Sequence, residues 1–227
     1  SLGNFFATEN KQAGYTLFQK IDFLNFWLYG FSFIALVTLL DPFVQLWAGG
    51  RFVLGLSISV AIAINFFVAG YMNTLWVFRS TLGLFKQGKF RPILVAVLNI
   101  VLSIVLGKLW GVFGVLFATF LSRASINLWY DPIVLHKYGF GVSSKPFFLR
   151  YLKRIILMTA VSLTMLAVRS VVLPAEATIL RFAAMTAITA VVPNAVFWLA
   201  YRRCDEYAYF RSVAKGRVIT PIRKKLR

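Results

Sequence analysis

Cysteine, histidine and acidic residues are all scarce in this chain of 227 residues. The single cysteine, Cys204, excludes an intrachain disulfide and a metal site built from several thiolates. The single histidine, His136, is expected in a loop, away from any group of acids. Membrane hydrolases and transferases usually need such a group for acid–base chemistry or for a metal. The sequence therefore argues against an enzyme, and we expect no catalytic residue, metal or other cofactor.

Only seven residues are acidic, against 25 lysines and arginines, which gives a formal net charge of +18. The acids are Glu9, Asp22, Asp41, Asp131, Glu176, Asp205 and Glu206, and we expect none of them in the middle of an apolar run. In a soluble protein this charge would suggest a nucleic-acid partner. The chain has no nucleic-acid motif, and basic residues also accumulate in the cytoplasmic loops of membrane proteins. We therefore expect no nucleic-acid partner.

Long apolar runs dominate the composition. Hydrophobic residues make up 59% and charged residues 14% of the chain, and the mean hydropathy is +0.76. Soluble domains are nearer to about 45–50% apolar and about 25% charged, and a membrane-spanning helix needs about 20 mostly apolar residues. The sequence predicts an all-α, polytopic membrane protein with six transmembrane helices. They are expected at residues 23–40, 52–78, 92–106, 112–132, 155–173 and 178–200.

Turn residues and charge runs divide the chain into five regions. We expect a cytoplasmic approach segment at 1–22, four transmembrane helices within 23–134, a basic cytoplasmic loop at 135–154, a C-terminal helix pair at 155–200 and a basic cytoplasmic tail at 201–227. The first helix should end at Asp41-Pro42, because proline disfavours helical geometry in the residue before it. Residues 107–111 form a tight connection, so the third and fourth helices should be antiparallel neighbours. Pro193 should kink the last helix.

The distribution of basic residues predicts the orientation. Segments 1–22, 79–91, 137–154 and 201–227 hold two, four, five and nine lysines and arginines, 20 in all, whereas the opposite side holds four. Cytoplasmic loops of membrane proteins carry the excess of lysine and arginine. We therefore expect both ends of this chain in the cytoplasm, which also agrees with an even number of spans.

Arg123 is a charged residue well inside the predicted span 112–132. A charge in mid-membrane costs roughly 3 kcal/mol or more on insertion scales, so it usually faces a partner or a watery cavity. Thr119 and Asn127 lie four residues to either side and share its helix face. Snorkelling toward the cytoplasm would oppose the direction of the Cα–Cβ bond. Arg123 either lines a cavity or is a structural residue satisfied by helix carbonyls or a buried polar partner.

A neighbouring face of the same helix carries small residues, which let another helix approach closely. This face comprises Gly114, Ala118, Ser122 and Ser125. We expect it to meet the small and polar face of the preceding helix, formed by Asn99, Ser103 and Gly107.

Three asparagines lie inside predicted spans: Asn65 and Asn73 in the second, and Asn99 in the third. They are candidates to line a substrate path together with Thr119, Arg123 and Asn127. Membrane asparagines also often hydrogen-bond between helices, and both alternatives stay open.

Several short features follow one another along residues 1–140. They are Ser1-Leu2-Gly3-Asn4, Leu46-Trp47, Gly49-Gly50, Gly83, Asn99, Ser103, Gly111-Val112-Phe113-Gly114-Val115, Thr119, Ser122 and Asp131-Pro132. In this order they resemble the C-terminal part of a bacterial oligosaccharide flippase, a Wzx-type transporter of O-antigen or exopolysaccharide in the MATE-like superfamily. Residues 150–227 are similar only as two further spans.

The resemblance implies a transporter with two lobes around a central cavity, of which this chain is a fragment that supplies second-lobe helices and the C-terminal pair. The implied substrate is an oligosaccharide on undecaprenyl diphosphate. It is moved to the outer leaflet of the bacterial inner membrane by alternating access, for the biosynthesis of surface polysaccharides such as lipopolysaccharide. The implied partners are membrane lipids, this lipid-linked oligosaccharide and the missing N-terminal lobe of the same protein.

Such a substrate is anionic and polar, so its path needs cations and hydrogen-bonding groups, which Arg123, Thr119 and Asn127 can supply. Three other classes of function stay open. The first is a MATE-like exporter of small cations, which would prefer an acidic site. The second is a membrane-embedded enzyme of envelope biosynthesis, and the third is a structural subunit.

Overall fold

The computed structural model describes residues 3, 5–6, 10–173, 178–214 and 216, and these residues form helices and turns without a strand. Five helices are long and apolar enough to cross a membrane. They are α2 (Lys11–Trp47), α3 (Leu56–Thr81), α4 (Arg91–Val134), α5 (Lys145–Val172) and α6 (Ile179–Tyr201). The short helices η1 (Gly50–Phe52), η2 (Lys86–Gly88) and η3 (Leu135–Phe140) connect them, and α7 (Asp205–Ala214) follows α6. The expected all-α, multi-pass architecture agrees with this arrangement.

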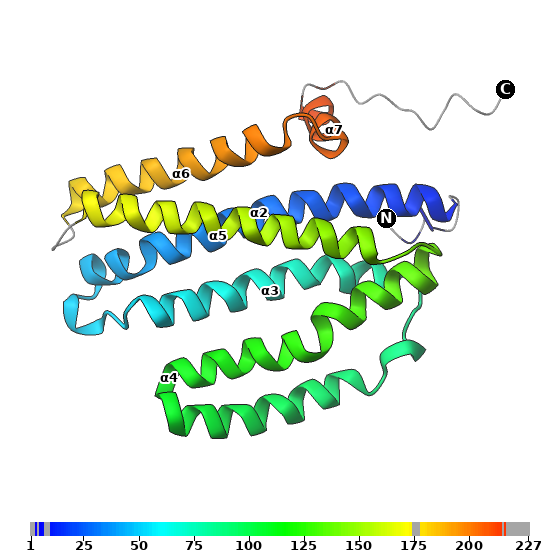
Figure 1. The fold of residues 1–227 in the computed structure, drawn as a ribbon, viewed down its shortest axis with the longest axis horizontal. Helices are drawn as coiled ribbons and strands as arrows, with labels where there is room; N and C mark the ends of the chain where they lie inside the picture. The colour runs from blue at the N-terminus through cyan, green and yellow to red at the C-terminus, as the bar shows by residue number, and fades with distance from the viewer. Residues whose placement is uncertain (1–2, 4, 7–9, 174–177, 215, 217–227) are drawn as a thin grey trace.

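Helix α2 is the central element of the bundle, because it packs against α3, α5 and α6 (Figure 1). Its first turn is capped by Asn10, whose side-chain oxygen accepts a hydrogen bond from the backbone N–H of Ala13 at 2.8 Å. Aromatic and aliphatic side chains fill the space between these helices. The largest fully buried ones include Phe18, Phe26, Ile34, Tyr71, Leu75, Phe78, Phe147, Met165 and Phe197.

The limits of α2 differ from those expected. The helix begins at Lys11, inside the segment expected as a cytoplasmic approach, and continues through Asp41-Pro42 to Trp47. A proline is tolerated within a membrane helix where neighbouring groups satisfy the backbone that it leaves free. Helix α6 likewise remains helical through Pro193.

Helix α4 is a hairpin of two arms, which we call the first arm (residues 91–110) and the second arm (residues 112–134). The helix breaks at Gly111, whose φ of 59° and ψ of −137° lie in a region that glycine reaches readily. Figure 1 shows the two arms side by side, with the second arm nearer to α3. The prediction of antiparallel neighbours is confirmed, although the first arm extends through 107–110 and reverses only at Gly111.

Small residues close the seam between the arms. A Cβ atom on Gly114 would lie only 1.9 Å from the carbonyl oxygen of Leu106, so the backbones approach at a distance that only glycine permits. Ala118 and Ser122 are fully buried, and Nδ2 of Asn99 donates to Oγ of Ser122 at 3.3 Å. Ser125 is different: it is exposed and donates to the carbonyl of Leu121 within its own helix. The packing face therefore ends one turn earlier than expected.

The region 135–154 is compact rather than an exposed loop. It consists of the π-helical turn η3 and the start of α5 at Lys145. His136 is fully buried there, with Nδ1 2.7 Å from the carbonyl oxygen of Pro132 and the ring 5.0 Å from that of Phe147, centroid to centroid. The expectation of an isolated loop histidine is therefore wrong, because aromatic residues of α2 and α5 enclose it. Of the expected tail 201–227, residues 215 and 217–227 lie outside the described chain, as do Glu9 and Glu176.

Candidate functional site

Acidic side chains lie inside the bundle, each beside an arginine. Asp22, Asp41 and Asp131 are between 1% and 6% exposed. Oδ2 of Asp22 lies 2.5 Å from Nη1 of Arg154, and Oδ2 of Asp41 lies 3.7 Å from Nη2 of Arg169. Asp41 also accepts a hydrogen bond from Ser59. The sequence pattern predicted these acids at helix ends and in loops. They lie within helices because the helices extend further than the apolar runs do.

Asp131 pairs with two arginines, whereas Asp22 and Asp41 each pair with one. Its Oδ1 lies 2.6 Å from Nη1 of Arg79 and also pairs with Arg91. Arg79 belongs to α3, Arg91 to the first arm of α4 and Asp131 to the second arm. One buried carboxylate thus joins three helical segments. Since it balances only one of the two guanidinium groups, the cluster keeps a net positive charge.

A polar hollow of about 360 Å³ opens between the two arms of α4, and we call it the hairpin hollow. It is lined by Arg91, Pro92, Val95, Ala96, Asn99, Thr119, Ser122, Arg123 and Asn127. Four of the predicted site residues therefore come together here: Asn99, Thr119, Arg123 and Asn127. The lining holds two arginines and no carboxylate, so the hollow is electropositive.

A second hollow of about 250 Å³ lies between α3 and the hairpin, and we call it the α3 hollow. It is lined by Ala69, Met72, Asn73, Trp76, Arg91, Arg123, Asn127 and Asp131. Asn73, a further predicted residue, joins the site in this way. Arg91, Arg123 and Asn127 border both hollows. These three side chains therefore form a polar wall between two neighbouring spaces.

Arg123 differs from the arginines that hold the bundle together. Arg79, Arg91 and Arg154 each pair with an aspartate. Arg123 is half-buried, and within the described part of the chain it donates no hydrogen bond and forms no ion pair. A structural arginine would be satisfied by carbonyls or by a buried polar partner. Its guanidinium is thus available to a ligand in either hollow.

Asn65 hydrogen-bonds between helices, which is the alternative to lining a substrate path. Its Nδ2 donates to the carbonyl oxygens of Ala61 at 2.9 Å and Leu116 at 2.8 Å. It thereby ties α3 to the second arm of α4, and it lines neither hollow. Asn99 combines both roles, because it borders the hairpin hollow and donates across the seam to Thr119 and Ser122, each at 3.3 Å.

Arg91 and Asp131 are site residues that the sequence reasoning missed. Arg91 was expected in a basic connector and Asp131 at a helix exit, yet both line the α3 hollow. A signal for Asp131 was present, because it continues the four-residue series of Thr119, Arg123 and Asn127 on one helix face. No local pattern marks Arg91, whose position depends on the fold of the hairpin.

The chemistry of the site favours an anionic, hydroxyl-rich ligand. Guanidinium groups bind phosphate oxygens through two parallel hydrogen bonds. Arg123 provides such a group without an aspartate partner, and Arg91, which pairs with Asp131, lies on the same wall. Asn73, Asn99 and Asn127 supply amides that both donate and accept. Among the described residues no group of three or more His, Cys, Asp or Glu side chains is placed to hold a metal ion.

No protein-family model, curated protein or solved structure matches this chain.

Proposed function

We propose that this chain is part of an oligosaccharide flippase of the bacterial inner membrane. Its substrate is an oligosaccharide linked to undecaprenyl diphosphate, which is moved from the cytoplasmic to the outer leaflet. One observation carries the proposal. Arg123 has no partner among the described residues and lies on the wall shared by two polar hollows, within a largely apolar helix hairpin.

The diphosphate is the charged part of such a substrate, so it depends most on groups of the protein to cross the membrane. Moving its charges through hydrocarbon is costly unless cations and hydrogen-bond donors replace the lost water. Arg123 offers a planar fork to the phosphate oxygens. Thr119, Asn99 and Asn127 offer hydroxyl and amide groups to the sugars. The position of Arg91 on the same wall adds a second cation next to the first.

The hairpin form of α4 supports six membrane passes rather than five. Each arm has about 20 residues, and at about 1.5 Å per residue this spans about 30 Å, the thickness of the hydrocarbon core. Six passes leave both ends of the segment on one side, which the excess of basic residues assigns to the cytoplasm. In this proposal the chain forms the second-lobe part of a MATE-like transporter, and the other lobe of the same protein completes the cavity.

A small-cation exporter is the competing transporter class, and Asp131 is the observation that bears on it. This carboxylate lines the α3 hollow, as an exporter of cations would require. However, two arginines already occupy it. With Arg123 nearby, the hollows attract anions, so the flippase is the better interpretation.

A set of three Arg123 variants tests the proposal in the protein as the cell makes it, with surface polysaccharide and membrane abundance measured together. Arg123→Lys keeps the charge but loses the fork, so export should fall only in part. Arg123→Ala should lose most export at normal abundance. Arg181→Ala, which removes an exposed arginine outside the hollows, is the matched control and should export normally.

Two outcomes would contradict the proposal. Normal export by Arg123→Leu would show that the cation is not needed on the substrate path. Loss of Arg123→Ala from the membrane, with normal export per remaining molecule, would identify a structural arginine.

A further inference from the structure

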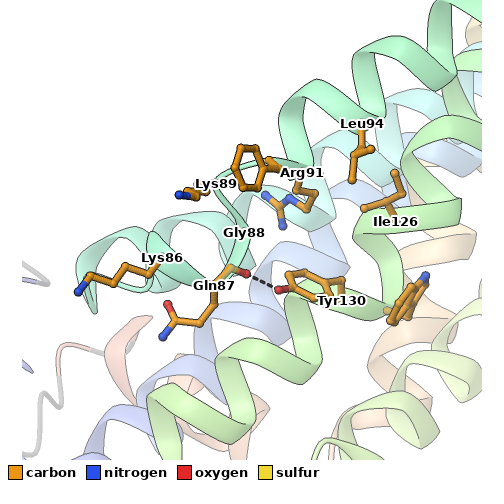
Figure 2. A pocket seen from close by; sticks show the side chains of 10 residues that line it. Lys86, Gln87, Gly88, Lys89, Arg91, Leu94, Ile126 and Tyr130 are labelled. Atoms are coloured by element: carbon orange, nitrogen blue, oxygen red, sulfur yellow. Dashed lines mark hydrogen bonds between the residues drawn. The ribbon is translucent and has the colours of Figure 1, made fainter.

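A third hollow lies outside the polar wall, where the connector between α3 and α4 meets the end of the second arm (Figure 2). We call it the connector hollow, and its volume is about 490 Å³. Its lining includes the cations Lys86, Lys89 and Arg91 and the aromatic residues Phe90, Trp129 and Tyr130. The hydroxyl of Tyr130 donates to the backbone carbonyl of Gln87, so the connector is fastened to the second arm and the hollow has a fixed wall.

The two ends of the connector hollow differ in character. Figure 2 shows Lys86 and Lys89 at one end, and Leu94 and Ile126 at the other. No carboxylate belongs to the lining. Within the described residues neither lysine forms an ion pair, although Nζ of Lys89 lies 4.7 Å from the ring centroid of Phe90. The hollow is therefore amphipathic, with uncompensated positive charge at one end and hydrocarbon at the other.

Its aromatic residues are typical of the depth of lipid headgroups. Trp129 is 51% exposed and Phe90 is 64% exposed, and both adjoin long apolar helices. Tryptophan and tyrosine concentrate at the boundary between hydrocarbon and headgroups. A soluble anion would occupy only the cationic end and would leave the rings and Leu94 uncovered. A lipid covers both ends at once.

We propose that the connector hollow binds an anionic phospholipid of the bilayer. Its phosphate lies between Lys86 and Lys89, and one acyl chain runs along Leu94 and Ile126. Lysines near a membrane surface attract anionic lipid. Arg91 also lines the hollow, but its charge is balanced by the ion pair with Asp131. This lipid is a resident ligand, distinct from the transported molecule that is proposed for the Arg123 wall, and the inference requires only that the helices span a membrane.

Fluorescence quenching of Trp129 tests the inference in the intact protein. The protein is titrated in mixed micelles with phosphatidylglycerol brominated on its acyl chains, and in parallel with brominated phosphatidylcholine. The difference between the protein and its Trp129→Phe variant isolates the signal of Trp129 from those of the other tryptophans. Phosphatidylglycerol should quench this signal at lower concentration, because only its headgroup carries a net negative charge.

A double variant and a matched control assign the effect to the hollow. Lys86→Gln with Lys89→Gln should raise the phosphatidylglycerol concentration needed for half-maximal quenching about tenfold, because each lysine contributes to the attraction of an anionic lipid. Lys145→Gln with Lys153→Gln removes the same charge from exposed positions of α5 and should change little. All four side chains are exposed, so both variants should fold, which elution volume and circular dichroism check.

Four results would overturn the inference. Equal quenching by the two lipids would remove the role of headgroup charge, and equal effects of the two double variants would remove the role of this hollow. Relief of quenching by inorganic phosphate would assign the lysines to a soluble anion. Relief by undecaprenyl phosphate at lower concentration than by phosphatidylglycerol would assign the hollow to the transported lipid, and would leave the proposed function standing.

Discussion

Arg154 on α5 and Asp22 on α2 form an ion pair inside the bundle, with 2.5 Å between Nη1 and Oδ2. Their side chains are only 6% and 2% exposed. The guanidinium also lies 5.1 Å from the ring centroid of Phe26, over its face. The two residues are 132 positions apart in the sequence, so the pair fixes where α5 docks on the central helix. It also shows that part of the basic charge of this chain has a structural use.

The first prediction concerns this ion pair. Removing one partner leaves an uncompensated buried charge, which typically costs about 3–5 kcal/mol. Arg154→Met and Asp22→Asn should therefore each lower thermal stability strongly in detergent. The double variant Asp22→Leu with Arg154→Met should be closer to the parent protein, because neither charge is left alone. If both single variants melt like the parent, the pair contributes nothing to the bundle.

The second prediction concerns the carboxylate shared by two arginines. Asp131→Asn leaves Arg79 and Arg91 facing each other without a counter-charge, so repulsion adds to the lost pairing. Arg79→Met leaves Asp131 paired with Arg91 and should be milder. Limited proteolysis of the connector between α3 and α4 should thus be fastest in Asp131→Asn. The opposite order of cleavage rates would show that Asp131 does not hold these segments together.

The third prediction concerns the hairpin glycines. Gly114→Ala places a methyl group against the carbonyl of Leu106, and overpacking of this kind typically costs about 1–3 kcal/mol. Gly111→Ala forces alanine to a φ of 59° and a ψ of −137°, a sparsely populated region that costs roughly 1–3 kcal/mol. Both should lower the melting temperature in detergent. Gly50→Ala meets no atom within 4 Å and has no positive φ, so it is the control and should be neutral. A neutral Gly114→Ala would contradict the close seam.

The fourth prediction concerns the number of passes. Single cysteines at Gly50 and Lys108 should react with an impermeant maleimide from outside the cell, and a cysteine at Ser143 should react only from inside. The native Cys204 is first replaced by serine, although burial raises the pKa of its thiol and so slows its own reaction. Reaction of the Lys108 position from inside would show that the hairpin does not cross the membrane twice.

The sequence by itself determined the all-α, membrane-spanning character, since long apolar runs permit little else in a bilayer. It also determined which residues share the polar face of the second arm, because Thr119, Arg123 and Asn127 recur every four positions whatever the rest of the chain does. A tight reversal within residues 107–111 was predicted as well, although only the structure places it at Gly111. These are local properties, and helix geometry converts them directly into structure.

Only the tertiary structure decided which partners the charges and amides have. The chain must fold before Arg154 meets Asp22, before Arg79 and Arg91 share Asp131, and before Asn65 reaches the carbonyl of Leu116. Each of these contacts joins different helical segments, and no periodicity within one segment specifies the residue that it will face. For the same reason the sequence could nominate Arg123 for a cavity, whereas the packed helices decided that it has two hollows beside it and no aspartate of its own among the described residues.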